Sequence, residues 1–342
     1  MADPDIRFGI VGCGAVAQLC HLPAAKHVRD VKVVALADKN LAQARLLGRR
    51  FGIDYCTDDY RQLVGKVDGV IVAVPNHLHG AVTADFVRME VPVLLEKPLA
   101  PTLEEAEALV EAAGAAGVLL QVGHMYRFSR SAQLVKQVID EGWLGPLHGF
   151  SLEYGSTGEW PSASGFFLRR SQAGGGVLMD IGSHMLDLLL WWLGDVAGVE
   201  YWDDCVDGVE AECRLSLALR TSRGIVQGDV TLSRLRRLGI SARIVGERFV
   251  LEWRNVGLMF EVRIRPTAWS SGKPFFTIDF DRRDTFARMF TEQLCGFAAA
   301  IRGSSEPAVP GRSVLGSLAL IERCYRERKS LDLPWLRHLV QV

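Results

Sequence analysis

The sequence lacks long hydrophobic runs and a strong charge of either sign. No apolar stretch reaches the roughly 20 residues that a membrane-spanning helix needs; the strongest candidate, residues 185–193, is too short and contains Asp187. The formal net charge is -1 over 342 residues, which argues against nucleic-acid or membrane-surface binding driven by overall charge. The N-terminus has no basic segment followed by an apolar one, so we expect no signal peptide.

Cysteine is present without a pattern. The 7 cysteines are an odd number and show no CxxC spacing, so we expect neither a disulfide framework nor a zinc site. Reduced thiols of this kind are typical of a cytoplasmic protein. Hydrophobic residues make up 49% and charged residues 23% of the chain, as in soluble globular proteins. The length suffices for two domains.

Short apolar stretches alternate with helical ones in the first third of the chain. We predict buried strands at residues 6–11, 32–37, 69–74, 92–95 and 118–122. A helix should start near Thr102, with Glu105 three residues on as a capping box. Strands alternating with helices predict an α/β domain around a parallel sheet.

A glycine-rich loop follows the first predicted strand. Residues 12–17 read Gly-Cys-Gly-Ala-Val-Ala, a GxGxxA pattern in which Gly12 permits a tight turn and Gly14 a close approach to a pyrophosphate. Asp38 ends the second strand, where an acid hydrogen-bonds the ribose hydroxyls of NAD. Lys39 beside it leaves NADP open as the alternative.

Further polar residues follow the third and fourth strands. Ligands bind beyond the carboxyl ends of parallel strands, so residues 75–79, Pro-Asn-His-Leu-His, and Lys97 should border the cofactor. A His77–His79 metal pair is the less favoured alternative, because no third ligand is nearby. We expect cofactor contacts from Gly12, Cys13, Gly14, Ala15, Val16, Asp38, Lys39, Val74, Pro75, Asn76, His79 and Lys97.

The most informative stretch pairs a carboxylate with an imidazole after a glycine run. Asp180 and His184 are four residues apart and would share one face of an α-helix, where the carboxylate can orient the ring and raise its basicity. Oxidising an alcohol needs such a base and a positive charge near the developing alkoxide, which Lys97 supplies. A metal held by Asp180, His184 and Asp187 is a rival, but Lys97 would repel a cation, so we expect no metal.

The rest of the chain changes pattern. Apolar and polar residues alternate over 211–220, and similar stretches cover 147–154, 225–232, 241–245, 249–253 and 259–264, which predicts one antiparallel sheet. Helices should close the chain at 284–302 and 312–329. So few helices would leave an apolar sheet face uncovered, which favours a homo-oligomer. Residues 234–237, Arg-Leu-Arg-Arg, are expected to be a solvated strand end; an anionic substrate or a subunit contact is the next interpretation.

Six motifs follow one another along the chain: residues 12–17, Asp38, 75–79, 96–98 (Glu-Lys-Pro), 127–128 and 180–187 (DxGxHxxD). In this order they resemble the motifs of the Gfo/Idh/MocA oxidoreductase family. The resemblance implies an α/β fold: an N-terminal Rossmann domain with a doubly wound parallel sheet (1–124), then a C-terminal α+β domain with a large open-faced antiparallel sheet (125–342). It implies nicotinamide-dependent oxidoreduction of a sugar, sugar derivative or cyclitol by a homodimer or homotetramer. It also implies catalytic roles for Lys97, Asp180 and His184, and a place for Glu96 near the nicotinamide.

Substrate contacts are expected from Tyr126, Arg127, Trp160, Arg169, Asp180 and His184. The segment around Trp160 resembles a loop that reaches the active site in some members. Some relatives have lost catalysis, so a dinucleotide-binding sensor or regulatory protein is the alternative function. The intact set of Lys97, Asp180 and His184 argues for an enzyme.

Overall fold

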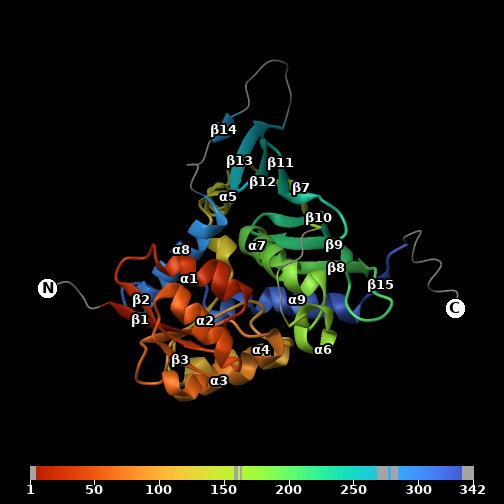
Figure 1. Ribbon diagram of the computed structural model, residues 1–342. Coiled ribbons are helices and arrows are strands. Elements are labelled where there is room, and N and C mark those ends of the chain that lie inside the picture. Colours follow the sequence, from red (N-terminus) through yellow and green to blue (C-terminus); the bar gives the residue numbers. More distant parts are fainter. Residues whose placement is uncertain (1–4, 158–160, 162–163, 268–275, 279–283, 333–342) are drawn as a thin grey trace.

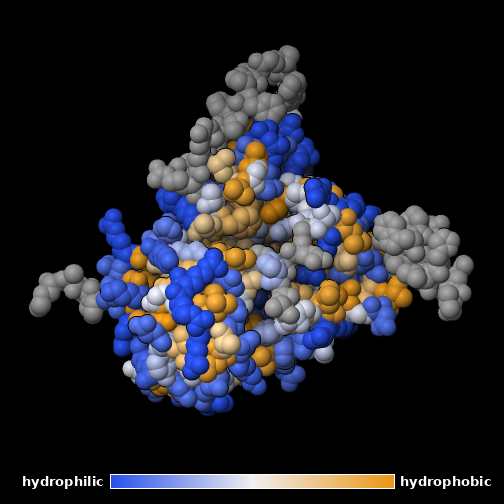
Figure 2. Space-filling view, viewed as in Figure 1, coloured by the Kyte–Doolittle hydropathy of each residue, from blue (hydrophilic) through white to orange (hydrophobic). Residues whose placement is uncertain are grey.

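The computed structural model describes residues 5–157, 161, 164–267, 276–278 and 284–332. Figure 1 shows two domains side by side, each built on one sheet. The first sheet has six strands in the order β3-β2-β1-β4-β5-β6, and the second has nine in the order β14-β13-β12-β11-β7-β10-β9-β8-β15. Figure 2 shows hydrophilic and apolar residues mixed over this face of both domains.

The first domain is the predicted Rossmann fold. All its strand pairs are parallel, and the order 3-2-1-4-5-6 is that of doubly wound dinucleotide-binding domains. The strands are β1 (Ile6–Val11), β2 (Val31–Ala37), β3 (Tyr55–Thr57), β4 (Gly69–Val72), β5 (Val93–Leu95) and β6 (Leu120–Val122). Strand β3 was not predicted, because its residues Tyr-Cys-Thr do not form an apolar run like those of the other short strands.

Helices connect these strands: η1 (Ala17–His21), α1 (Leu22–Ala25), α2 (Leu41–Phe51), α3 (His79–Arg88) and α4 (Leu103–Ala115), with short turns η2 (Tyr60–Leu63), η3 (Asn76–Leu78) and η4 (Met125–Phe128). Helix α4 starts as predicted, since the Glu105 backbone N–H donates to Thr102 Oγ1 at 3.3 Å. The strands end at one edge of the sheet, where the predicted cofactor loops gather.

The second sheet comprises β7 (Leu147–Gly155), β8 (Asp195–Asp203), β9 (Glu212–Thr221), β10 (Gly224–Ser233), β11 (Gly239–Gly246), β12 (Phe249–Val256), β13 (Met259–Pro266), β14 (Phe276–Ile278) and β15 (Lys329–Ser330). It is mostly antiparallel, but β7 pairs in parallel with β10, and β8 with β15. The predicted antiparallel sheet is therefore confirmed, with two parallel strand pairs that the sequence did not indicate. The alternation of side chains along a strand shows which residues face the core. Which strand lies next to it, and in which direction, depends on the path of the whole chain.

The helical elements of the second domain are α5 (Arg130–Asp140), η5 (Phe166–Leu168), α6 (Arg170–Ala173), η6 (Leu178–Gly182), α7 (Ser183–Leu193), α8 (Phe286–Ile301), η7 (Gly311–Val314) and α9 (Leu315–Arg326). Three helices pack on the sheet: α7 on β9, α5 on β12 and β13, and α9 on β8. The closing helices also return to the first domain, where α8 packs against α1 and α9 against α4.

The opposite sheet face is charged, which corrects the expectation of an uncovered apolar face. On β11 to β13 it carries Arg243, Glu252, Arg254, Glu261, Arg263 and Arg265. Three of their ion pairs join neighbouring strands, and Arg263 pairs with Glu261 on its own strand. Arg254 Nε lies 2.6 Å from Glu261 Oε1, and Arg265 Nη2 lies 3.0 Å from Glu252 Oε1. The oligomer stays a prediction, but an apolar sheet face no longer motivates it.

One helical run, Arg170–Leu193, is long and apolar enough to cross a membrane by length and composition. In its most apolar window, 78% of the residues are buried inside the protein. Helix α7 within this run packs between α5, α9 and β9. The run is therefore the central helix of the second domain.

Candidate active site

Lys97, Asp180 and Arg234 form a chain of ion pairs where the two domains meet. Lys97 follows β5, Asp180 lies in η6, and Arg234 follows β10 directly. Lys97 Nζ donates to Asp180 Oδ1 at 2.6 Å, and Arg234 Nη2 donates to Asp180 Oδ2 at 2.6 Å. Burial would raise the pKa of Asp180, but the two cations outweigh it and hold that pKa below its usual range. The carboxylate is therefore ionised and fixed between two positive charges.

The predicted pairing of Asp180 with the His184 ring is not found. Both carboxylate oxygens of Asp180 face cations, and His184 Nδ1 is buried without a hydrogen-bond partner among the described residues. The expectation assumed α-helical spacing, whereas residues Leu178–Gly182 form a π-helical turn, in which the hydrogen bonds span five residues. Asp180 thus positions Lys97 and not the imidazole.

His184 lies in a closely packed aromatic environment. Its ring meets those of Tyr126 and His124 edge-on, with centroids 5.3 Å and 5.6 Å away. Burial, followed by the charge of Lys97 and the neighbouring His124, lowers the pKa of His184 well below its usual value. The imidazole is therefore neutral near pH 7 and can accept a proton.

Tyr126, predicted to contact substrate, is instead a buried support. Only 2% of it is exposed, and its ring also packs against Trp253 and Phe260. Its hydroxyl is hydrogen-bonded to that of Tyr154, and burial raises the pKa of both phenols. Tyr154 on β7 lies near Asp180 and Arg234, whose charges affect its pKa. It was not predicted as a site residue, because no motif in its strand distinguishes it.

Arg127 also differs from its predicted role. Its Nε and Nη2 donate to the two carboxylate oxygens of Asp187 at 2.8 Å and 2.6 Å, and it reaches Ser313 as well. The guanidinium is therefore committed to a structural ion pair between η4 and α7. Trp160 lies outside the described residues. Arg169 is exposed before α6 and bonds Gln172 at 3.3 Å, so its role toward substrate stays a prediction.

The rival metal site is not assembled. Asp180 pairs with Lys97, whereas Asp187, also considered as a ligand, pairs with Arg127. Within the described part of the chain, no group of three or more His, Cys, Asp or Glu residues could hold a metal ion.

The glycine loop has the geometry that a dinucleotide requires. Gly12 has φ of +96°, and a Cβ there would lie 2.4 Å from the Ala73 carbonyl oxygen, so a side chain is excluded. At Gly14 a Cβ would meet nothing within 4 Å, so the backbone borders open space. Asp38 Oδ2 accepts the backbone N–H of Cys13 at 2.7 Å, which places the carboxylate beside the loop.

Other predicted cofactor contacts fall into two groups. Ala15, Val16, Val74, Pro75 and Lys39 are half-buried or exposed around the strand ends. His79 is buried, and its ring nitrogens contact the carbonyl oxygens of Pro98 and Val74 at 2.7 Å and 2.9 Å. It therefore ties two loops together, which corrects its assignment as a cofactor ligand. Asn76 is also buried and donates to the Ala173 carbonyl at 2.8 Å, which links the domains.

Glu96 has a partner that the sequence analysis did not identify. Its Oε1 lies 2.7 Å from His21 Nε2, and both side chains are buried. Burial would raise the pKa of Glu96, but His21 and then Lys97 hold it below its usual range. No motif marks His21; its spacing of four from the buried Ala17 is the one signal that it faces inward.

The glycine run before Asp180 is explained by Glu210. The Glu210 carboxylate accepts the backbone N–H groups of Gly176 at 3.0 Å and Leu178 at 2.9 Å, and the Tyr325 hydroxyl at 2.8 Å. A Cβ at Gly176 would lie 2.0 Å from the Glu210 carbonyl oxygen. Glu210 thereby fixes the start of the helical run that carries Asp180 and His184, and no local motif marks it.

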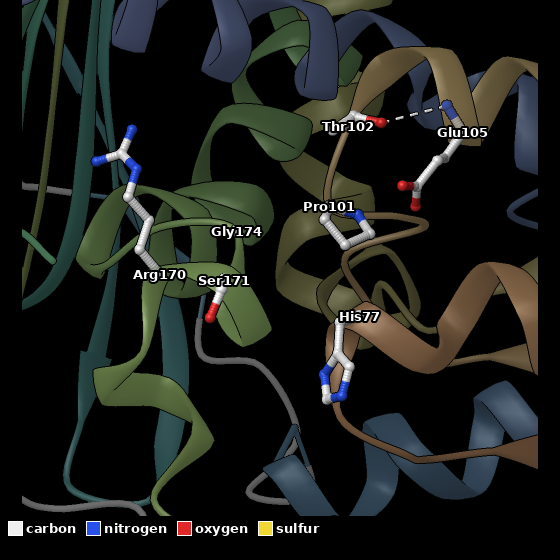
Figure 3. A pocket seen from close by; sticks show the side chains of 7 residues that line it. All are labelled: His77, Pro101, Thr102, Glu105, Arg170, Ser171 and Gly174. Atoms are coloured by element: carbon white, nitrogen blue, oxygen red, sulfur yellow. Dashed lines mark hydrogen bonds between the residues drawn. The ribbon is translucent and has the colours of Figure 1, made fainter. Parts of the chain in front are cut away.

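A cleft of about 510 Å³ opens between the domains beside this site. In Figure 3, residues after β4 and β5 face α6 across it, and the Arg170 side chain points away from the first domain. Its lining residues are His77, Pro101, Thr102, Glu105, Arg170, Ser171 and Gly174. Neither Lys97 nor His184 lines it, so we place the chemistry at the ion pairs and not in this cleft.

Comparison with known proteins agrees with this architecture. Residues 6–124 match the oxidoreductase family with an NAD-binding Rossmann fold, GFO/IDH/MocA, and residues 132–252 match the GFO/IDH/MocA C-terminal domain. The chain belongs to this family, and its first domain is an NAD-binding Rossmann domain.

Relatives with assigned activities are similar over different lengths. D-glucoside 3-dehydrogenase of Escherichia coli (strain K12) is 31% identical over 57% of this chain and 56% of its own. 1,5-anhydro-D-fructose reductase of Ensifer adhaerens is 28% identical over 92% and 93%. A structure of levoglucosan dehydrogenase with NADH has a TM-score of 0.82 at 20% identity, covering 95% of this chain and 98% of its own, which shows the same fold. The chain spans only about half the length of the first curated relatives it matches.

Proposed function

We propose that this chain is an NAD-dependent oxidoreductase that transfers a hydride to or from a carbon bearing a hydroxyl or keto group on a sugar, sugar derivative or cyclitol. The observation that carries the proposal is the Lys97–Asp180 ion pair after β5, near a neutral, buried His184. The names of relatives, among them a D-glucoside 3-dehydrogenase and an inositol 2-dehydrogenase, support the substrate class.

The first domain fits NAD through its own residues. The open backbone at Gly14 suits a pyrophosphate, and helix η1 begins just after the loop, so its free N–H groups favour an anion. Asp38 would accept ribose hydroxyls and repel a 2′-phosphate, which favours NAD over NADP. When bound, the nicotinamide supplies or accepts the hydride.

In alcohol oxidation, the substrate hydroxyl loses a proton and its carbon loses a hydride. Neutral His184 takes the proton, because its lowered pKa leaves a free nitrogen lone pair at working pH. Lys97, paired with Asp180, places a positive charge that stabilises the developing alkoxide. Its position is set by two bonds, to Asp180 Oδ1 and to the Asp180 carbonyl oxygen at 3.1 Å.

In ketone reduction, the same groups act in reverse. The hydride reaches the carbonyl carbon, and the alkoxide that forms takes its proton from the His184 imidazolium. Burial disfavours a charged His184, which makes the imidazolium a good proton donor. Lys97, positioned by Asp180, again stabilises the alkoxide.

The test is a screen for NAD⁺ reduction with sugars, amino sugars, sugar nucleotides and inositols, followed by single-turnover measurements. Lys97→Ala and His184→Ala should each slow hydride transfer by about 100-fold or more, whereas NAD affinity should stay largely intact, because neither residue contacts the pyrophosphate. Lys136→Ala, which removes a lysine paired with Asp140 on the surface of α5, is the matched control. Hydride transfer at the wild-type rate in both site variants would refute the assignment, and NAD binding without any turnover would favour the sensor alternative.

A further inference from the structure

Arg234 reaches the active site from the opposite side to Lys97. It binds Asp180 Oδ2 while Lys97 binds Oδ1, each at 2.6 Å, so one carboxylate separates the two cations. Their side chains keep 25% and 15% of their surface exposed. A ligand that reaches Lys97 therefore also has access to Arg234.

Most of the Arg234 guanidinium is uncommitted. A guanidinium carries five N–H donors, and one bond to Asp180 is the only side-chain hydrogen bond of Arg234 within the described residues. The Phe167 ring lies 5.9 Å from its central carbon and limits its motion. The remaining N–H groups form a planar fork, which matches the two oxygens of a carboxylate.

The carboxylates near this site are unequally shared. Lys97 interacts with both Asp180 and Glu96, whereas Asp180 is the one carboxylate paired with Arg234 among the described residues, and His184 is neutral. Arg236, two residues on, is already neutralised by the buried Glu212 at 2.6 Å. A partly buried positive charge without a full partner favours an anionic ligand, because pairing offsets its lost hydration.

The position of Arg234 suits it to bind an anionic group of the substrate and not to stabilise the alkoxide. Lys97 lies near the predicted base, whereas Arg234 lies beyond the far oxygen of Asp180. A substrate whose reacting carbon lies at Lys97 and His184 would bring a group a few bonds away to Arg234. In a sugar acid, that group can be the carboxylate.

From this geometry we propose that Arg234 is a specificity-determining residue and that the substrate is a polyhydroxy compound bearing a carboxylate, such as a hexuronate or hexonate. The proposal rests on the proposed function for the reaction but concerns binding. It explains why an arginine, and not a neutral residue, stands beside an already paired Asp180.

The experiment measures binding and turnover separately. Calorimetry on the NADH-loaded protein compares hexuronates and hexonates with the matched neutral hexoses and hexitols, and steady-state assays then give KM and kcat for each pair. The variants are Arg234→Gln, Arg234→Lys and the control Arg237→Gln. Arg237 lies in the same loop but bonds Thr157 Oγ1 at 3.0 Å, so its loss changes the charge equally without removing the fork.

We expect the best acid to bind wild-type protein at least about tenfold more tightly than its neutral counterpart, and Arg234→Gln to weaken acid binding by about 10- to 100-fold. In Arg234→Gln, binding of the neutral sugar should weaken much less than binding of the acid. In Arg237→Gln, both affinities should stay at the wild-type level. Arg234→Lys should recover only part of the acid affinity, because a lysine cannot bind Asp180 and offer a fork together. Circular dichroism confirms that each variant is folded.

Two results would overturn the proposal: equal or tighter binding of neutral sugars by wild-type protein, or an equal loss for acid and neutral sugar in Arg234→Gln. The second result would make Arg234 only a positioning residue for Asp180. Tight, Arg234-dependent binding of an acid without turnover of any compound would support this proposal while contradicting the proposed function. Turnover of neutral sugars with no preference for acids would support the proposed function while contradicting this proposal for Arg234.

Discussion

Replacing Asp187 with Asn should destabilise the protein more than any other single change to an ion pair near the site. Asp187 and Arg127 are joined by two hydrogen bonds of 2.8 Å and 2.6 Å, and their side chains are only 2% and 10% exposed. Removing one partner of a buried pair leaves an unpaired charge, which costs about 3–5 kcal/mol. That is a large part of the roughly 5–15 kcal/mol that stabilises a typical domain.

The double variant Arg127→Met/Asp187→Leu should be far less damaging than the sum of its single changes. Both charges are then absent, and replacing a buried pair by apolar residues is often neutral. Some loss remains, because Arg127 also lies over the Trp191 ring at 5.6 Å, a contact worth about 0.5–2 kcal/mol. We therefore expect a coupling energy of at least about 2 kcal/mol between the two positions.

Urea unfolding gives the free energy of unfolding of the wild type, the two single variants and the double variant. It is followed by both circular dichroism and tryptophan fluorescence, because the chain has two sheets. A loss below about 1 kcal/mol in Asp187→Asn, or full additivity in the double variant, would refute the reasoning. The same proteins decide the role of Arg127. A raised KM at unchanged stability in Arg127→Met would restore its predicted contact with substrate.

Three further outcomes are expected. The rate of alcohol oxidation should stay constant as the pH falls through 6.5 and decline only at lower pH. The base must be neutral to accept a proton, and the pKa of His184 is lowered well below 6.5. A pH–rate profile with an inflection above 6.5 would contradict this prediction. Asp38→Ser should weaken NAD binding by about tenfold, or 1.4 kcal/mol, and reduce discrimination against NADP, as fluorescence titrations with both cofactors can show. If the protein dimerises through the charged sheet face, high salt should weaken the dimer and Arg243→Glu should disrupt it; sedimentation of a monomer at every salt concentration would remove the idea.

The first domain could be predicted from the sequence because its signals are local. Strand β1 (Ile6–Val11) is an apolar run that leads directly into Gly12, whose φ of +96° is a local turn geometry that favours glycine. The buried faces of β9 and β10 are likewise visible as alternation, since neighbouring side chains on a strand point to opposite sides. The catalytic candidates Lys97, Asp180 and His184 also stand out by residue type and order.

Only the tertiary structure decided how those candidates pair. Lys97 and Asp180 are 83 residues apart, Asp180 and Arg234 are 54 apart, and His21 and Glu96 are 75 apart. A helix or strand pattern reports contacts over a few residues, so it assigned Asp180 to His184 and left Arg127 free for substrate. Buried charges are stable only beside opposite charges, and the chain supplies those partners from distant strands and helices. The partner of each ionised group is therefore a property of the packed fold.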